Sequence, residues 1–204
     1  MLTIVDYGAG NLRNVYMAFR RLGLEALVTA EAELVSRASA LVLPGVGAFG
    51  DSIGKLRALG LEEPITSSIR DGVPFLGICV GLQLLFEVSE EMGEHRGLGV
   101  LAGRVRRFSQ GLSVPHMGWN QIHQARAIPL WRGVPDGSYA YFVHSYYADP
   151  EDRAVVAATT DYGLDYASAV AQGNLYAIQF HPEKSQDVGE RILRNFAAQA
   201  GLMG

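Results

Sequence analysis

The first half of the chain alternates short apolar runs with segments of helical periodicity, and this alternation limits the fold more than any other feature. The apolar runs lie at Leu2–Val5, Glu25–Val28, Ala40–Leu43 and Phe75–Ile78. Such runs predict buried strands, and the segments between them predict helices. Strands that alternate with helices favour a parallel sheet that is covered by helices on both faces. We therefore expect an α/β fold with a central, mostly parallel sheet.

Three helices are expected to start at particular residues. Asn11 and Asp51 carry side chains that can cap a helix N-terminus, and each precedes or opens a helical pattern. A further helix is expected to begin close to Val80 and to carry Leu82, Leu84, Leu85 and Phe86 as its apolar residues.

The second half of the chain has a different pattern, with many strand candidates and few helical segments between them. A final helix is expected from about Ser185 to Ala200. No linker interrupts the pattern, so we expect residues 1–204 to form one domain. The sheet is expected to gain an antiparallel or mixed extension, whose strand candidates are Val100–Phe108, Gln121–His123, Tyr139–Tyr146, Ala154–Thr160, Ala167–Gln172 and Tyr176–Phe180.

Charge and composition exclude several classes of protein. The formal net charge is -4, with 17 basic and 21 acidic residues, so the basic excess of a nucleic-acid-binding module is missing. The single cysteine, Cys79, allows no internal disulfide and suits a reducing compartment. Asp6 interrupts the apolar N-terminus, and no apolar run reaches the roughly 18 residues that span a membrane. We expect a soluble, cytoplasmic protein that binds neither nucleic acid nor membranes.

Residues Gly45–Gly50 read GVGAFG and match the dinucleotide-binding pattern G-x-G-x-x-G between a strand and a helix. The match is incomplete in two ways. It follows the third predicted strand rather than the first, and Asp71, the acidic residue near the required distance, precedes the next strand rather than ending it. A glycine-rich turn, or a loop whose backbone amides approach a ligand, explains the same residues.

Cys79 is a candidate nucleophile because it lies where a buried strand gives way to a helix. Gly77 and Gly81 stand two residues before and after it, which is the form of a nucleophile elbow with cysteine in place of serine. The positive end of a helix dipole favours the thiolate, and the free amide of Val80 can donate to an oxyanion. A free thiol is more often a buried structural residue. The flanking Gly77 and Gly81 favour the interpretation of Cys79 as a nucleophile.

A cysteine nucleophile needs a base and a group that orients the base, and residues 181–183 (HPE) provide both. His181 ends a predicted strand, and Pro182 biases it towards an extended conformation. Glu183 then lies on the same side of the backbone, within reach of the imidazole. His116 and His144 lie among aromatic and glycine residues and remain open candidates. With one cysteine and no CxxC or HExxH pattern, we expect no metal and no other cofactor.

Five blocks of sequence carry a resemblance to a known family, the class I (triad) glutamine amidotransferases. The Cys79 turn with Gln83 and the HPE motif are typical of the superfamily. The blocks span most of the chain and read DYGAGNL at 6–12, PGVGAF at 44–49, VPHMGWN at 114–120, YFVHSY at 141–146 and QFHPEKS at 179–185.

The resemblance implies a flavodoxin-like sheet and a set of roles. Cys79 attacks the carboxamide of L-glutamine to form a thioester, His181 transfers the proton, and Glu183 orients His181. Backbone amides of Val80 and of the loop at Val46 and Gly47 stabilise the oxyanion. The residues implied to bind glutamine are Gly47, Gln83, His144, Ser145 and Tyr146.

The resemblance also implies a separate (β/α)8 cyclase subunit that consumes the ammonia, because free ammonia is mostly protonated at neutral pH. We expect the interface near the ammonia exit to include His116, Met117, Trp119 and Asn120, although a strand packed in the core explains these residues as well. Three alternatives to the glutaminase stay open: another Cys-His hydrolase such as a peptidase, a nucleotide-binding oxidoreductase, and a non-catalytic scaffold.

Overall fold

A parallel sheet forms the centre of the molecule, as the alternating pattern predicted. The computed structural model describes residues 1–109 and 111–203. The central strands pair side by side and all run parallel. In spatial order they are β2 (Ala26–Thr29), β1 (Leu2–Val5), β3 (Ala40–Gly45), β4 (Phe75–Cys79) and β13 (Leu175–Ile178).

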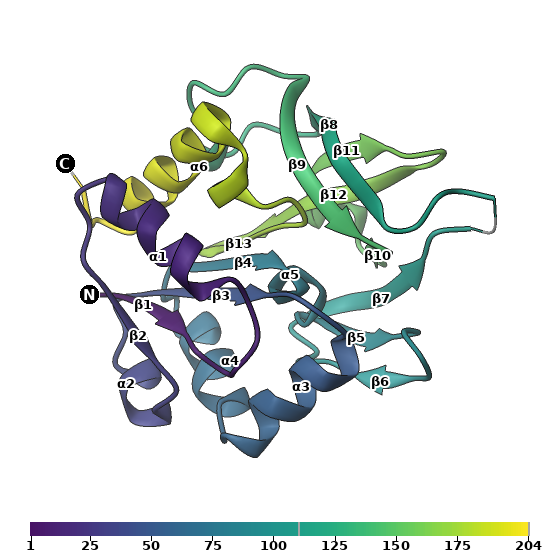
Figure 1. The fold of residues 1–204 in the computed structure, drawn as a ribbon. Helices are drawn as coiled ribbons and strands as arrows, with labels where there is room; N and C mark the ends of the chain where they lie inside the picture. Colours follow the sequence, from purple (N-terminus) through teal and green to yellow (C-terminus); the bar gives the residue numbers. More distant parts are fainter. Residues whose placement is uncertain (110, 204) are drawn as a thin grey trace.

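Helices cover both faces of this sheet (Figure 1). On one face lie α1 (Leu12–Arg21) and α6 (Gln186–Gln199). On the other lie α2 (Ala32–Ser36), α3 (Phe49–Ala58) and α4 (Glu62–Arg70). Each longer helix turns an apolar stripe inward, as α6 does with Ile192, Leu193 and Phe196. Strands β1, β3 and β4 between the two layers are buried on both sides, which explains why they read as continuous apolar runs.

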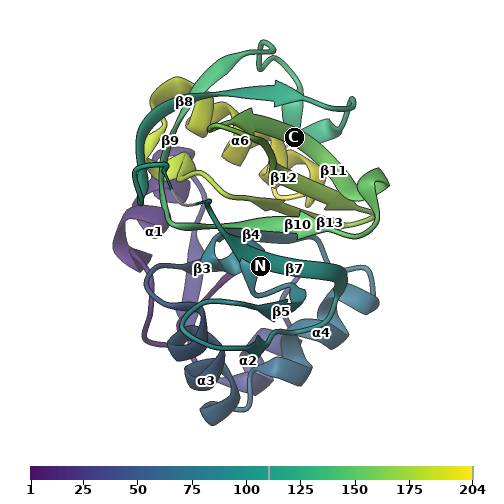
Figure 2. The same cartoon turned by 90° about the vertical axis from the view of Figure 1, so that its right-hand side faces the viewer.

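The second half extends the sheet with mixed pairing, as predicted. Beyond β13 the order continues through β12 (Asp165–Gln172), β10 (Tyr146–Pro150), β7 (Leu101–Arg107), β5 (Phe86–Ser89) and β6 (His95–Arg96). From β12 a branch leads through β11 (Val156–Asp161) and β8 (His116–Gln124) to β9 (Ser138–His144). Figure 2 shows this branch above the central layer. Short 3₁₀ turns lie at Pro129–Trp131, Arg153–Val155 and Pro182–Lys184.

The helix after Cys79 is much shorter than predicted. It is α5 (Val80–Gln83), and Phe86 already begins strand β5. The carbonyl oxygens of Leu84 and Leu85 accept hydrogen bonds from the backbone amides of Leu98 and Val100, at 2.8 and 2.9 Å. Because these carbonyls bond to a distant segment, the helix stops after one turn.

Asn11 takes the N-cap position of α1 as predicted, but the predicted cap at Asp51 is wrong. Asp51 lies inside the first turn of α3, which begins at Phe49, and the Phe49 amide donates instead to Glu91 Oε2 at 2.6 Å. Asn11 precedes α1 but makes no side-chain capping hydrogen bond. A carboxylate from a distant loop therefore replaces the local cap that the pattern suggested.

None of the helices in residues 1–109 and 111–203 has the length and apolar character needed to cross a bilayer.

The strand register places Gly45 of β3 opposite Cys79 of β4, and Ile178 of β13 opposite Ile78. The carboxyl ends of three parallel strands therefore meet at Cys79, which is where open α/β sheets form their sites.

Candidate active site

Cys79 occupies a strained turn between β4 and α5. Its φ and ψ are 56° and -111°, a left-handed conformation that costs energy for a residue with a side chain. The backbone around it leaves no room for side chains. A Cβ on Gly81 would overlap the Leu43 carbonyl oxygen, and a Cβ on Gly77 would lie 2.8 Å from the Gly81 oxygen. The two glycines permit the tight turn that the sequence suggested.

His181 lies just beyond β13 and is held by a short network of hydrogen bonds. Its amide donates to the Tyr141 carbonyl at 2.9 Å, and its own carbonyl accepts from Ser185 Oγ at 2.6 Å. His181 Nδ1 lies 2.9 Å from Glu183 Oε1, and the Glu183 side chain is only 1% exposed. Since a carboxylate can only accept, Nδ1 carries the proton and Nε2 is left without a hydrogen-bond partner in the described residues.

The charges around His181 favour its protonated form. Burial by itself lowers the pKa of the His181 imidazole, because it disfavours the charged ring. Negative charge on Cys79 and the hydrogen-bonded Glu183 carboxylate outweigh burial and raise that pKa to about 10. A positively charged imidazole in the same cavity as Cys79 suits the activation of a cysteine nucleophile.

A cavity of about 170 Å³ collects most of the site residues that the sequence predicted. Glu183 lies behind His181 and does not line it. In sequence order, the lining residues are Val46, Gly47, Cys79, Val80, Gln83, Glu91, Val143, His144, Ser145, Tyr146 and His181. The predicted nucleophile, base, oxyanion loop and glutamine-binding residues therefore share one cavity.

Gln179 is a site residue to which the sequence assigned no role. It is fully buried, and its Nε2 lies 3.7 Å from Cys79 Sγ while its Oε1 accepts from Gln83 Nε2 at 3.1 Å. Gln83 Nε2 also donates to the Tyr146 carbonyl at 2.9 Å. The only signal in the sequence was its place two residues before His181, which puts it on the same side of an extended strand.

Glu91 is the second residue that sequence reasoning missed. It lines the cavity and holds the α3 N-terminus through Phe49 N. This contact also weakens the dinucleotide interpretation of Gly45–Gly50, because a carboxylate stands where a pyrophosphate would meet the helix. Asp71, the acidic residue considered for the ribose, is the C-terminal cap of α4. Gly47, with φ of +94°, forms a turn beside Cys79 instead.

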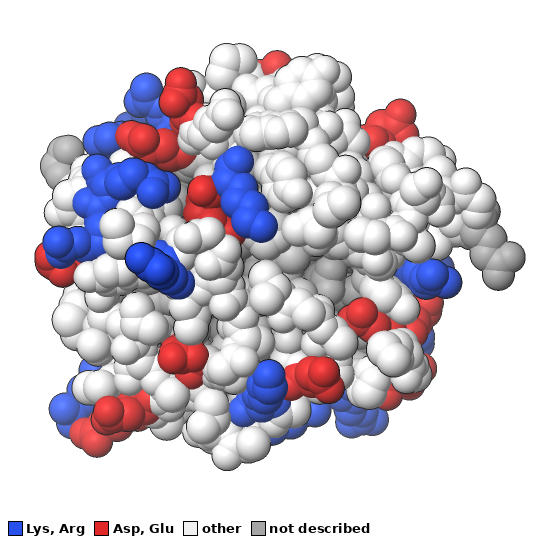
Figure 3. Space-filling model, viewed as in Figure 1, with Lys and Arg blue, Asp and Glu red and all other residues white. Residues whose placement is uncertain are grey.

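The four predicted interface residues lie on β8 in different environments. Met117 and Trp119 are exposed, at 65% and 46%, and His116 is buried at 4%. Asn120 is half-buried. In Figure 3, few charged side chains appear in the region that β8 and β9 occupy in Figure 1. The residues thus form a strand with one exposed apolar face, and their role at an interface stays a prediction.

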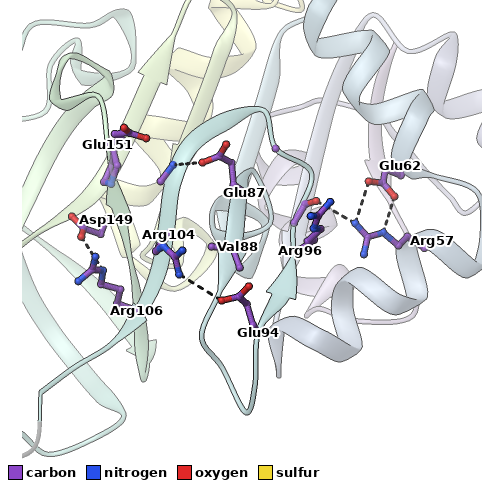
Figure 4. A pocket seen from close by; sticks show the side chains of 14 residues that line it. Arg57, Glu62, Glu87, Val88, Glu94, Arg96, Arg104, Arg106, Asp149 and Glu151 are labelled. Atoms are coloured by element: carbon purple, nitrogen blue, oxygen red, sulfur yellow. Dashed lines mark hydrogen bonds and ion pairs between the residues drawn. The ribbon is translucent and has the colours of Figure 1, made fainter.

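A larger cavity, of about 870 Å³, lies apart from Cys79 at the edge formed by β5, β6 and β7 (Figure 4). Several of its charged side chains form ion pairs. Arg57 binds Glu62 at 2.8 Å, Arg106 binds Asp149 at 3.1 Å, and Arg104 lies 3.7 Å from Glu94. The smaller cavity is the candidate site, because among the cavities of the described residues it is the one lined by both Cys79 and His181.

A parallel α/β sheet with a cysteine elbow and a His-Glu pair at its carboxyl edge defines a class of enzyme. The chain belongs to the class I glutamine amidotransferase family, because the family model described as "Glutamine amidotransferase class-I" matches residues 3–200. A crystal structure described only as a glutamine amidotransferase is similar, with a TM-score of 0.77, 25% identity and 98% of each chain covered.

Within this family the chain belongs to the HisH subunits of imidazole glycerol phosphate synthase. The HisH subunit of Syntrophotalea carbinolica is 55% identical over 203 residues, covering 96% of this chain and 98% of the relative. The HisH subunit of Geobacter metallireducens is 52% identical over 203 residues, covering 96% and 97%. The family resemblance predicted from the sequence blocks is confirmed.

Proposed function

We propose that the chain hydrolyses L-glutamine to glutamate and ammonia in the cavity at Cys79, as the glutaminase subunit of an imidazole glycerol phosphate synthase. The ammonia passes to a separate cyclase subunit, which makes imidazole glycerol phosphate and aminoimidazole carboxamide ribotide in cytoplasmic histidine biosynthesis. The observation that carries the proposal is the shared cavity, in which Cys79 and His181 face the Gly47 loop and Gln83.

The reaction uses each side chain at a stated atom. Cys79 Sγ attacks the side-chain carbonyl carbon of glutamine, and the thiol proton is held at His181 Nε2, because Nδ1 is bound to Glu183. The same proton goes to the leaving nitrogen, so ammonia departs and a thioester remains. Water then attacks the thioester with His181 as general base, which releases glutamate and restores the thiol.

The remaining lining residues stabilise charge and hold the substrate. The amide of Val80, at the start of α5, and a backbone amide of the loop at Val46 and Gly47 donate to the oxyanion. Gln83 and the backbone of His144, Ser145 and Tyr146 bind the amino-acid end of glutamine. We add Glu91, whose carboxylate lines the cavity and complements the α-ammonium group of the substrate.

The size of the cavity favours a single amino acid over the substrates of the rival hypotheses. Its volume of about 170 Å³ is below the roughly 300–1,000 Å³ that larger ligands occupy. A peptide or a dinucleotide needs more room, so a peptidase and an oxidoreductase fit less well. A scaffold protein has no need for a buried His181–Glu183 pair beside a strained cysteine.

The cyclase is proposed to bind over β8 and β9, giving a heterodimer. Met117 is exposed on β8 and pairs in register with Val143 of β9, which lines the cavity. Trp119 and Tyr139 extend this exposed apolar surface, and their side chains are 46% and 55% exposed. A partner seated there lies one strand away from the reacting atoms, which suits transfer of ammonia without release into water.

The test is glutamate release from L-glutamine, measured as purified cyclase subunit is added to the protein. We expect turnover that rises with the cyclase and saturates at one cyclase per chain. Cys79→Ala is the matched control and should bind the cyclase without turnover. No glutamate release at saturating cyclase would refute the proposal.

A further inference from the structure

Two histidines that the proposed chemistry does not use as acids or bases face each other beside the cavity. His116 on β8 and His144 on β9 are register partners, and they are 4% and 6% exposed. His116 Nδ1 and His144 Nε2 are 3.3 Å apart. Tyr162 stacks on the His116 ring at 4.0 Å between centroids, and Phe142 stacks on it at 4.9 Å.

The hydrogen-bond partners determine which nitrogen of each ring carries the proton. His144 Nδ1 lies 2.7 Å from the Tyr146 carbonyl, which can only accept, so Nδ1 is the donor and Nε2 the acceptor. Asn120 Nδ2 donates to the Asp161 carbonyl at 2.8 Å, and Asn120 Oδ1 accepts from Gln121 N at 2.8 Å. These two bonds fix the orientation of the Asn120 amide.

With the amide fixed, Asn120 Nδ2 donates to His116 Nε2 at 3.2 Å, which leaves His116 Nδ1 as the donor towards His144 Nε2. The Tyr166 hydroxyl lies 3.3 Å from His116 Nδ1 and 3.2 Å from His144 Nε2, and it can pass the bond on in the same direction. Every donor therefore points from Asn120 towards the cavity.

The chain of hydrogen bonds ends at the groups proposed to bind glutamine. The Tyr146 carbonyl accepts from His144 Nδ1 and from Gln83 Nε2 together. Gln83 is in turn bonded to Gln179, whose Nε2 lies 3.7 Å from Cys79 Sγ. A change in the orientation of either histidine is thus transmitted to the backbone at Tyr146 and to the Gln83 amide.

We propose that Asn120, His116 and His144 form a positioning relay that holds the Ser145–Tyr146 backbone and the Gln83 amide in the geometry that binds glutamine. The relay rests on the proposed glutaminase function and adds to it two residues, His116 and Asn120, that the sequence placed at an interface. Neither touches the substrate, so both act through His144 and the Tyr146 carbonyl.

The protonation of the pair agrees with this geometry. Burial is the largest cause that lowers the pKa of His144, to about 3, and nearby His116 and His181 lower it further, against the hydrogen bond to Tyr146. Burial lowers the pKa of His116 to about 4. The other titratable groups that pack on the pair are the hydroxyls of Tyr162 and Tyr166. Both rings are therefore neutral near pH 7. The hydrogen bonds described above require this state, because each ring uses one nitrogen as a donor and the other as an acceptor.

The decisive experiment measures KM and kcat for glutamine with saturating cyclase in two variants of His116. His116→Phe keeps a ring between Phe142 and Tyr162 and removes both hydrogen bonds. We expect KM to rise about tenfold, the usual effect of losing one buried partner, while kcat changes less than about threefold. His116→Asn keeps a donor near the Nδ1 position, and its KM should stay within about threefold of wild type.

A matched control separates the relay from local packing. Tyr162→Phe removes a hydroxyl that donates to the Ser113 carbonyl at 2.7 Å, beside His116 but outside the relay, and KM should not change. Should His116→Phe fail to fold, Asn120→Leu carries the test, because it removes the first donor, and a KM rise of about threefold is expected. A chloroketone analogue of glutamine, which alkylates Cys79, should show the same shift in its half-saturating concentration.

The outcomes are distinct. A selective KM rise in His116→Phe, partly rescued in His116→Asn, supports the relay. An unchanged KM in His116→Phe or Asn120→Leu overturns it, and so does an equal rise in both His116 variants, which would indicate packing alone. A wild-type protein that releases no glutamate with the cyclase present refutes the proposed function, and the relay with it.

Discussion

Gly81→Ala should be one of the most damaging small substitutions in the chain, because it changes the contact between β3 and the nucleophile turn. A Cβ at this position overlaps the Leu43 carbonyl oxygen and lies 2.9 Å from the Leu43 carbonyl carbon. Both atoms are backbone of a buried central strand, so no side-chain rotation relieves the overlap. Either β3 or α5 has to move, and overpacking of this kind costs about 1–3 kcal/mol. We expect the upper end of that range.

The assay is urea unfolding of Gly81→Ala beside Gly54→Ala as its matched control. A loss of about 3 kcal/mol should lower the urea midpoint by about 1 M, for an m-value of about 3 kcal/mol/M. A Cβ at Gly54, exposed in α3, meets nothing within 4 Å, so alanine there should stabilise the protein by about 0.5–1 kcal/mol.

The same displacement should reduce catalysis, because α5 carries the Val80 amide. We expect kcat/KM of Gly81→Ala to fall at least about tenfold with the cyclase present. If Gly81→Ala unfolded within about 0.5 kcal/mol of wild type, the steric reasoning about this turn would be wrong.

Three further predictions concern the titratable residues. Cys79→Ala should abolish glutamate release yet keep the fold and the cyclase complex, and residual turnover near wild type would mean a different nucleophile. His181→Ala should lower kcat about a thousandfold, and Glu183→Gln less, because an amide oxygen still accepts from Nδ1; equal losses would contradict an orienting role. Because the folded-state pKa of His144 is lowered to about 3 from its usual 6.5, the unfolded state takes up a proton below about pH 6.5 that the folded state does not. His144 by itself should therefore lower the free energy of unfolding by about 2 kcal/mol from about pH 7 to pH 5, and His144→Gln should remove that part of the slope in urea titrations.

The features that depend on nearest neighbours were predictable from the sequence. The strands around Cys79 are buried on both faces, so their apolar runs mark them directly. Gly77 and Gly81 flank the cysteine because the turn itself excludes side chains. The His181–Glu183 contact also follows from local geometry, since residues two apart in an extended segment face the same side.

Features that depend on distant partners were not predictable in the same way. The helix after Cys79 ends at Gln83 because carbonyls beyond it bond to Leu98 and Val100. Asp51 was the expected cap of α3, but Glu91 reaches the helix from a loop far along the chain. Local propensity cannot anticipate a competitor that only folding brings close.

The sequence by itself determined the class of fold, the nucleophile turn and the pairing of His181 with Glu183, because each depends on residues within a few positions of one another. Only the tertiary structure decided that His181 and Cys79 line one cavity, since that requires β13 to pair in parallel with β4. It also decided that His116 is buried against His144 rather than exposed on β8, because Phe142 and Tyr162 stack on its ring. Register and burial are properties of the assembled sheet, and no short stretch of sequence contains them.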